Sequence, residues 1–380
     1  MGGLCRRQSR GGVLGDVSVP SPARTEVDVK SIVRDTVWTT ASMLGMSRLA
    51  RRLNRNRVRI LMYHAVVPDQ APFQRWTHLP QQSFEWQIAY LQRNYNIQPL
   101  AEVVACMRAG EVVAPNTAVI TFDDGYESVY RRAFPVLQRR RVPASVFLTT
   151  QLVESQQLLW TSRLFLAMRA TKRTRLLLSD LRSPGADLHA MKFAELVFSS
   201  VAERDAAADQ LRRWLKYLPD DRRVALLAAI EQQLQVSEYP DFACEFAPLT
   251  WDQVAEMKLS GLVQFGAHSQ THPILSRLPD SQLHSEVFGS CQAVKERCGS
   301  DGLHFAYPNG ERGDFNEDTK RVLQRAGAGS GLSTIEGLCR AGDDLFELRR
   351  IGVGSDMSKG RFAAMCSGLE SGVKRRMGRL

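Results

Sequence analysis

The sequence lacks the features that mark secreted, disulfide-stabilised or membrane-spanning proteins. Its seven cysteines are scattered without a Cys-x-x-Cys pair, so they indicate neither a zinc knuckle nor a disulfide framework. No apolar segment near the N-terminus leads to a small-residue cleavage site, and the longest uncharged stretch there, Thr36 to Ser47, is too short to span a bilayer. We therefore expect a cytoplasmic protein with reduced thiols, peripheral to a membrane at most.

Acidic residues are scarce at both ends of the chain. Residues 1–60 carry 12 Lys and Arg against 4 Asp and Glu, and the last ten residues carry four basic side chains and no acid. The formal net charge of +10 therefore belongs to the ends, and residues 61–370 are close to neutral. A body without a basic face argues against a nucleic-acid partner. The basic N-terminus suits contact with an anionic membrane, and a solvated tail without a partner is the alternative.

Buried strands without polar alternation recur along the chain, separated by segments of helical periodicity. About seven such strands occur between residues 57 and 353. This order predicts an α/β fold, a distorted (β/α)7-type barrel of parallel strands over residues 57–370. Residues 1–56 are expected to form a basic, partly disordered leader, and residues 371–380 a basic tail.

The alternation of strand and helix is interrupted between about residues 154 and 247. This stretch is dense in Leu, Ala, Arg and Glu, and Leu227, Ile230 and Leu234 share one helical face. We interpret it as a helical insertion and not as barrel wall. A weaker amphipathic pattern over residues 31–53 suggests a helix that lies on a membrane surface.

Polar residues follow several of the predicted strands at the point where each strand ends. They are His64, Asp123, Asp124, His268 with His272 four residues later, and the segment from Pro308 to Gly310. In a parallel barrel all C-terminal strand ends face one rim, where barrel active sites are built. A turn or a structural histidine would explain each feature alone. Their coincidence at the ends of separate strands favours a functional site.

One carboxylate and two imidazoles form a suitable ligand set for a catalytic divalent metal ion. Because side chains alternate along an extended strand, two adjacent aspartates cannot easily both face that ion. We therefore expect one aspartate to bind the metal and the other to accept a proton from the attacking water. Pro273 argues against a regular helix for the two histidines, because the residue before a proline avoids the α region.

Three motifs resemble those of the polysaccharide deacetylases, the NodB homology family: TFDDG at 121–125, HSQTH at 268–272 and FAYPNG at 305–310. The resemblance implies a hydrolase that removes N-acetyl groups from a carbohydrate containing N-acetylhexosamine: a polysaccharide, an oligosaccharide or a lipid-linked sugar. It implies Asp123 as the catalytic base and the main-chain N–H of Asn309 as an oxyanion donor. The implied metal ligands are Asp124, His268 and His272, with zinc favoured over nickel, cobalt or iron.

The sequence departs from the family pattern at two positions. Ala306 replaces the Arg that orients the base, and no histidine follows His304 where the family has Leu-x-His. Arg350 is our candidate for the missing positive charge, although Arg349 stands beside it.

The segment LMYHAVV at 61–67 resembles a permuted branch of the family, which acts on exopolysaccharides rich in N-acetylglucosamine and takes its catalytic histidine from an N-terminal Met-Tyr-His strand. We therefore predict that His64 is the general acid and that a nearby carboxylate holds it protonated. Action on O-acetyl esters or cyclic amides remains open, as does an inactive carbohydrate-binding protein. Trp76, Trp160 and Tyr307 are candidates for stacking on sugar rings, although core packing is the commoner role of such residues.

Overall fold

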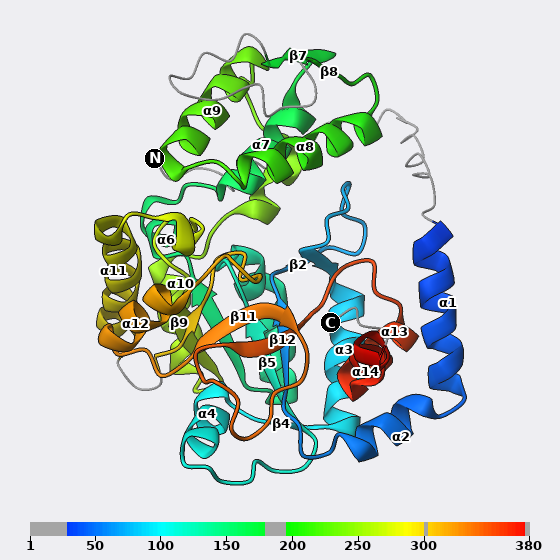
Figure 1. The fold of residues 1–380 in the computed structure, drawn as a ribbon. Coiled ribbons are helices and arrows are strands. Elements are labelled where there is room, and N and C mark those ends of the chain that lie inside the picture. Colours follow the sequence, from blue (N-terminus) through cyan, green and yellow to red (C-terminus); the bar gives the residue numbers. More distant parts are fainter. Residues whose placement is uncertain (1–28, 179–194, 300–302, 377–380) are drawn as a thin grey trace.

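Seven parallel strands close into a barrel in a computed structural model that describes residues 29–178, 195–299 and 303–376 (Figure 1). The strand order is β1, β12, β11, β10, β9, β6, β5, and β5 pairs again with β1. The predicted (β/α)7 barrel is confirmed. The barrel strands are β1 (Arg59–Tyr63), β5 (Thr117–Phe122), β6 (Ala144–Leu148), β9 (Val263–Ala267), β10 (Phe305–Ala306), β11 (Gly331–Glu336) and β12 (Leu348–Gly352).

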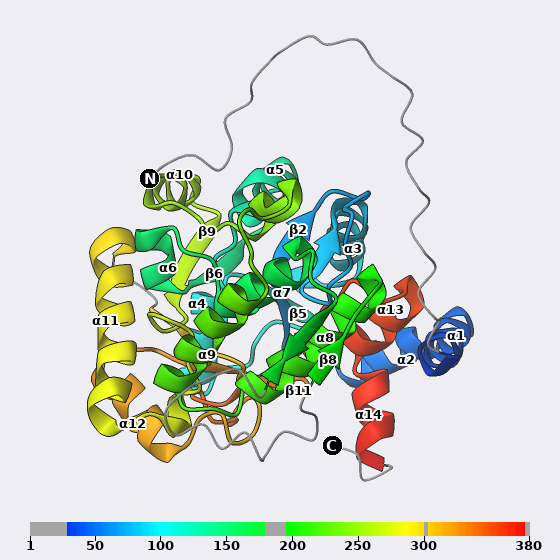
Figure 2. The same cartoon turned by 90° about the horizontal axis from the view of Figure 1, so that it is seen from above.

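Helices surround the barrel, and short strands lie outside it (Figures 1 and 2). The short strands are β2 (Ala65–Val67), β3 (His78–Pro80) and β4 (Asn96–Ile97). The helices are α3 (Gln81–Asn94), α4 (Leu100–Arg108), α5 (Phe134–Arg140), α10 (Trp251–Leu259), α11 (Asp280–Cys298), α12 (Glu317–Arg325) and α13 (Lys359–Ser367).

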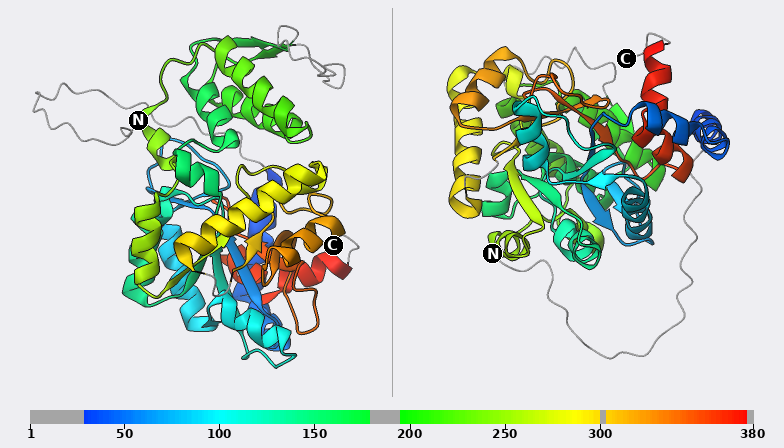
Figure 3. Two further views of the ribbon diagram at one scale, coloured as in Figure 1. Left: turned by 90° about the vertical axis from the view of Figure 1, so that its left-hand side faces the viewer. Right: turned by 90° about the horizontal axis from the view of Figure 1, so that it is seen from below.

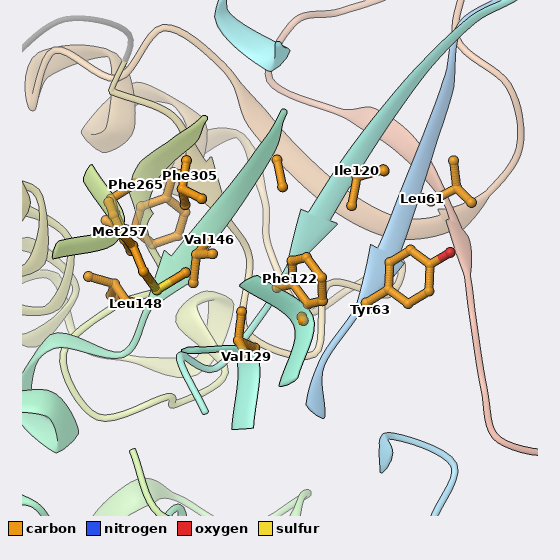
Figure 4. Close-up of a cluster of buried hydrophobic side chains, with 14 of the residues drawn as sticks. Leu61, Tyr63, Ile120, Phe122, Val129, Val146, Leu148, Met257, Phe265 and Phe305 are labelled. Carbon is orange, nitrogen blue, oxygen red and sulfur yellow. The ribbon is translucent and has the colours of Figure 1, made fainter. Parts of the chain in front are cut away.

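Side-chain alternation along the strands sorts the core into two layers. The outer layer packs against the surrounding helices and includes Leu61, Tyr63, Ile120, Phe122, Val146 and Leu148 (Figure 4). A second buried cluster joins the alternate positions Ile60, Val119, Phe147, Leu332 and Leu348 to α4, which closes the lower end of the barrel in Figure 1. The same alternation, continued towards the strand ends, directs His64, Asp123 and Arg350 into the barrel mouth.

The segment predicted as an insertion forms a layer over the barrel (Figures 1 and 3). Besides helices it contains a two-stranded antiparallel sheet. It has a hydrophobic cluster of its own, separate from the barrel core. Because it follows β6, it lies at the C-terminal ends of the strands. Its elements are α7 (Trp160–Ala170), β7 (Arg175–Leu177), β8 (Glu195–Val197), α8 (Val201–Leu215) and α9 (Asp220–Gln233). The short helix α6 (Thr150–Ser155), between β6 and this layer, packs against α11.

Regular structure begins before the barrel, where the weak pattern over residues 31–53 suggested one helix and the structure has two. Helices α1 (Val29–Met43) and α2 (Met46–Leu53) precede β1 and pack against α13. Ser42 Oγ donates to the carbonyl of Gly360 at 3.0 Å, which ties α1 to the start of α13. The sequence did not predict that α1 and α2 pack against α13, because this contact joins segments more than 300 residues apart. Helix α14 (Leu369–Arg376) begins the predicted basic tail, and residues 1–28 and 377–380 lie outside the described residues. None of the described helices has the length and apolar character needed to cross a bilayer.

Candidate active site

The polar strand ends predicted from the sequence converge at the mouth of the barrel. Backbone conformation changes sharply there: Asp124, Ser269, His272 and Asn309 all have left-handed φ values, between 60° and 71°. Such conformations are costly for residues with side chains and persist where the surrounding structure imposes them, typically at functional sites. The turn at Asp124 also separates the two aspartates, so that Asp123 and Asp124 have different partners.

Three side chains form a cluster with the composition of a metal site. Asp124 Oδ1 lies 3.4 Å from Nε2 of His268 and 3.4 Å from Nε2 of His272. Tetrahedral zinc, with ligand bonds of ~2.0–2.2 Å, places its ligands roughly 3.3–3.5 Å apart, so these spacings fit. His268 Nδ1 faces the carbonyl of Ala306 at 2.7 Å, which assigns the proton to Nδ1 and leaves Nε2 as the ligand atom. All three side chains are buried.

Protonation in this cluster also suits a metal site. Burial opposes ionisation of Asp124, but the hydrogen bond with His268 and the proximity of His272 lower the pKa of Asp124 below its ordinary value. Burial lowers the pKa of His272 to about 3, so its ring is neutral. For His268, burial is outweighed by the hydrogen bond to Asp124, and the pKa is raised. A proton on His268 Nε2 must therefore leave before that atom can act as a ligand.

Asp123 is held by a buried arginine. Arg350 donates from Nη1 to Asp123 Oδ1 at 2.8 Å and from Nη2 to Oδ2 at 2.7 Å, and its Nε donates to the carbonyl of Ser333. Burial opposes ionisation of Asp123, but Arg350 outweighs it and the pKa of this carboxyl lies below its ordinary value. Arg349 is half-buried and its side chain lies against Gly337, away from Asp123. Of the two neighbouring arginines, Arg350 is thus the one that contacts Asp123.

His64 follows β1 and lies in the wall of the same site. Its ring meets Trp76 edge-on, with centroids 5.6 Å apart, and its Nδ1 has no partner among the described residues. Burial lowers the pKa of His64 despite the nearby carboxylates of Asp124 and Asp123. The expectation that a carboxylate keeps His64 protonated is therefore wrong for the protein without substrate: desolvation of the imidazolium outweighs the attraction, and the ring is neutral at neutral pH.

A cavity of about 410 Å³ opens above these residues. It is lined by His64, Asp123, the three clustered side chains and Asn309. No acceptor among the described residues pairs with the main-chain N–H of Asn309. The opposite wall comes from the insertion and consists of Leu159, Thr161, Ser162, Phe165, Asp205, Asp209 and Arg212.

The three aromatic residues predicted near the rim have different environments. Trp76 is 45% exposed and lines the cavity, so it can meet a ligand. Trp160 is buried in the insertion, where Arg223 lies 4.9 Å above its ring. Tyr307 is fully buried and stacks on Phe315, with centroids 4.1 Å apart. Trp160 and Tyr307 therefore serve packing.

Comparison with known proteins agrees with this geometry. The sequence profile of the family described as Polysaccharide deacetylase matches residues 111–330, more than half of the chain. The chain belongs to the polysaccharide deacetylase family. Members of this family are hydrolases that act on carbon–nitrogen bonds of sugars.

More specific similarities cover part of the chain or are structural. A 79-residue stretch is 37% identical to the poly-beta-1,6-N-acetyl-D-glucosamine N-deacetylase of Escherichia coli K12, which is 20% of this chain and only 12% of that protein. The deacetylase PplD of Streptococcus pyogenes, solved with acetate, superposes with a TM-score of 0.53 at 19% identity, over 82% of this chain and 98% of that one. IcaB of Ammonifex degensii gives a TM-score of 0.52 at 19% identity, over 82% and 97%. These two likenesses show a shared fold.

Glu286 of α11 supports the candidate site, although the sequence analysis did not identify it. Its Oε2 accepts hydrogen bonds from the N–H groups of Gln270 and Thr271, at 2.8 and 3.0 Å. Its Oε1 accepts from the Thr271 hydroxyl at 2.6 Å. Glu286 therefore anchors the loop that carries His272. No motif marks it, because it lies within a helix whose surface is rich in charged residues.

We expect Glu286→Gln to weaken metal binding by a factor on the order of 10 to 100, the usual effect of removing a partner that orients a ligand loop. The amide cannot accept all three hydrogen bonds, so the position of His272 becomes less defined. Equilibrium dialysis against a competing chelator measures the change. Glu296→Gln, on the same helix, is the matched control, since the one hydrogen bond that its carboxylate accepts from the described residues comes from Gln292. Equal metal affinity in Glu286→Gln and wild type would show that the loop carrying His272 keeps its conformation without Glu286.

Proposed function

We propose that the protein removes N-acetyl groups from a sugar that contains N-acetylhexosamine, with a divalent metal bound by Asp124, His268 and His272. One observation carries this proposal: the three-residue cluster opens into the cavity beside an ionised, arginine-held Asp123. Family membership and the partial similarity to a poly-N-acetylglucosamine deacetylase support it. Zinc is the metal that the two imidazoles and one carboxylate suit best, with nickel, cobalt and iron as the alternatives.

Each residue has a defined task in hydrolysis. A bound divalent ion would supply Lewis acidity and activate the attacking water. Asp123 accepts the proton of that water, and Arg350 holds the carboxylate in place and keeps it ionised. Asn309 lines the cavity, its main-chain N–H has no acceptor among the described residues, and this N–H would donate to the oxygen of the tetrahedral intermediate.

His64 supplies the proton that the leaving amine requires when the carbon–nitrogen bond breaks. Because its pKa is lowered, His64 is neutral in the resting site. It must therefore gain a proton during the reaction, and Asp123, which has just accepted one from water, is the available source. Acetate and a free amine are the products, and the base and the acid return to their starting states.

Acetate release tests the proposal. The full chain is stripped with a chelator, reloaded separately with zinc, nickel, cobalt or iron, and incubated with short β-1,6- and β-1,4-linked N-acetylglucosamine oligomers. We expect acetate from at least one oligomer with at least one metal, and none from the stripped protein. Acetate release from O-acetylated sugars but not from N-acetylated ones would show an esterase and contradict the proposal. Binding of oligomers without acetate release under any metal would leave a carbohydrate-binding protein.

His64→Ala separates amide from ester hydrolysis. We expect kcat on an N-acetyl substrate to fall by a factor on the order of 10² to 10⁴, because the amine leaves poorly without a proton donor. The loss on an activated aryl acetate should be much smaller, since that leaving group departs without a proton. His304→Gln is the control, because His304 is a buried histidine just before β10, at the opposite end of the barrel, paired with Ser330. Equal losses on both substrates would make His64 a positioning residue.

A further inference from the structure

Exposed apolar side chains are concentrated at the N-terminal helices. Sixteen large hydrophobic residues are exposed in the described part of the chain, and seven of them fall between residues 33 and 53. Met43, Leu44 and Leu53 are 83%, 75% and 77% exposed. A cluster of this kind is unusual for a surface that faces only water.

Helix α2 is the centre of this surface. Its inner face consists of Ser47 and Ala50, which are buried against the neighbouring helices. The outer stripe is formed by Met46, Leu49 and Leu53, at spacings of three and four residues, so the three side chains lie along one line. Met43 and Leu44, at the corner between α1 and α2, are exposed at one end of this stripe. We call these five residues the apolar stripe.

Basic residues flank the apolar stripe on its outer side. Arg48 and Arg52 are exposed and lie four residues apart on α2, and Arg55, also exposed, follows the end of the helix. No acidic residue occurs between residues 36 and 68. The acids of the neighbouring helices are already engaged: Asp35 accepts from the N–H of Ser358, and Glu370 is buried beside Arg361 and Lys374. The outer face of α2 is therefore both apolar and cationic.

From this arrangement we infer that α2 and the corner before it dock the protein on an anionic lipid surface. Apolar side chains that project beside arginines match the two layers of such a surface, the acyl region and the phosphate headgroups. A second copy of the chain fits less well, because a symmetric contact through α2 would bring the same arginines face to face. Figures 1 and 2 show α1 and α2 at the outer edge of the molecule, and the elements that pack against them, α13 and α14, lie on their inner side.

This surface lies apart from the cavity, so the inference stands independently of the reaction. None of its residues lines the cavity. Substitution of the stripe should therefore leave kcat on a soluble oligomer unchanged. Docking would matter for a substrate that is itself attached to lipid, because it places enzyme and substrate on the same surface.

Vesicle sedimentation with the full chain tests the inference. The vesicles contain phosphatidylcholine alone or phosphatidylcholine mixed with phosphatidylglycerol. The variants are the pair Leu49→Ser with Leu53→Ser, the pair Arg48→Glu with Arg52→Glu, and the control Leu259→Ser. Leu259 is 88% exposed at the end of α10 and offers an isolated apolar side chain of the same kind. Sedimentation velocity without vesicles gives the oligomeric state of each variant.

The wild-type chain and Leu259→Ser should bind the anionic vesicles and bind pure phosphatidylcholine poorly. Each double variant should lose roughly tenfold or more of its partitioning into anionic vesicles. Unchanged binding of the Leu49 and Leu53 pair would overturn the inference and assign any lipid binding to another part of the chain. The inference would also fail if the wild-type chain did not bind vesicles and instead formed a dimer that the Leu49→Ser and Leu53→Ser pair dissociated. Loss of vesicle binding in Leu259→Ser would also contradict the inference, because binding would then depend on exposed apolar side chains in general and not on the apolar stripe.

Discussion

Asp123→Asn should lower kcat for deacetylation by a factor on the order of 10² to 10⁴, while the bound metal is retained. This factor corresponds to about 2.7 to 5.4 kcal/mol of transition-state stabilisation. The asparagine keeps the shape of the side chain and can still accept one hydrogen bond from Arg350, but it cannot accept a proton from water. Metal should be retained because the Asp123 carboxylate accepts both of its hydrogen bonds from Arg350 and is not one of the three clustered side chains. Steady-state kinetics together with metal analysis measure both effects.

The control for this variant must address stability, since Asn leaves a buried arginine without its counter-charge. Removing one partner of a buried ion pair costs about 3–5 kcal/mol in the free energy of unfolding. Thermal melting therefore accompanies the kinetics.

Arg350→Lys should lower kcat less than Asp123→Asn does. Arg59→Lys, at the other end of β1, should reduce stability and leave kcat unchanged. Arg59 is fully buried, donates to the carbonyls of Cys366, Arg57 and Asn54, and lies over the Tyr95 ring, away from the cavity. Metal loss in Asp123→Asn equal to that of Asp124→Asn would refute the division of roles.

His272→Ala should lose most of the bound metal and nearly all activity. The two remaining ligands hold a divalent ion poorly, and alanine leaves no donor in the position that the loop creates. Burial has already removed the proton from His272, with a pKa of about 3, so binding at this atom requires no proton release at neutral pH. Atomic absorption of the purified variant gives the metal content, and acetate release gives the activity.

His284→Ala is the matched control for this second variant. His284 lies on α11 and stacks against Phe288, outside the cavity. It should keep both metal and activity. Full metal stoichiometry in His272→Ala would remove this histidine from the ligand set and leave Asp124 and His268 with a different third partner.

The barrel and its mouth were predictable because the relevant signals are local. Continuous apolar runs such as 117–122 mark strands buried on both faces, and the polar residues after them mark strand ends. Parallel strands align their C-terminal ends, so residues as distant as Asp123 and His268 could be assigned to one rim from the chain order alone. The family motifs then supplied the roles, and the contacts of Asp124 are compatible with them.

What the sequence could not supply depends on packing between distant elements. Arg350 and Arg349 are neighbours of the same type, and only the alternation of β12 within the closed barrel directs Arg350 towards Asp123. Glu286 acts on a loop through its position on a helix face, which has no sequence signature. The charge state of His64 was mispredicted because a nearby carboxylate can be named from the sequence, whereas the degree of desolvation cannot.

The seam where the barrel closes is also where Asp123 meets Arg350. Strand β1 pairs with β12 on one side and with β5 on the other, so the hydrogen bonds between Arg350 and Asp123 span strands separated by more than 200 residues of chain. The ion pair, and His64 between its two strands, can form only after the last strand has joined the first. The arrangement of the proposed base therefore depends on the last strand: before β12 pairs with β1, the cluster of Asp124, His268 and His272 after β5 and β9 has no arginine-held Asp123 beside it.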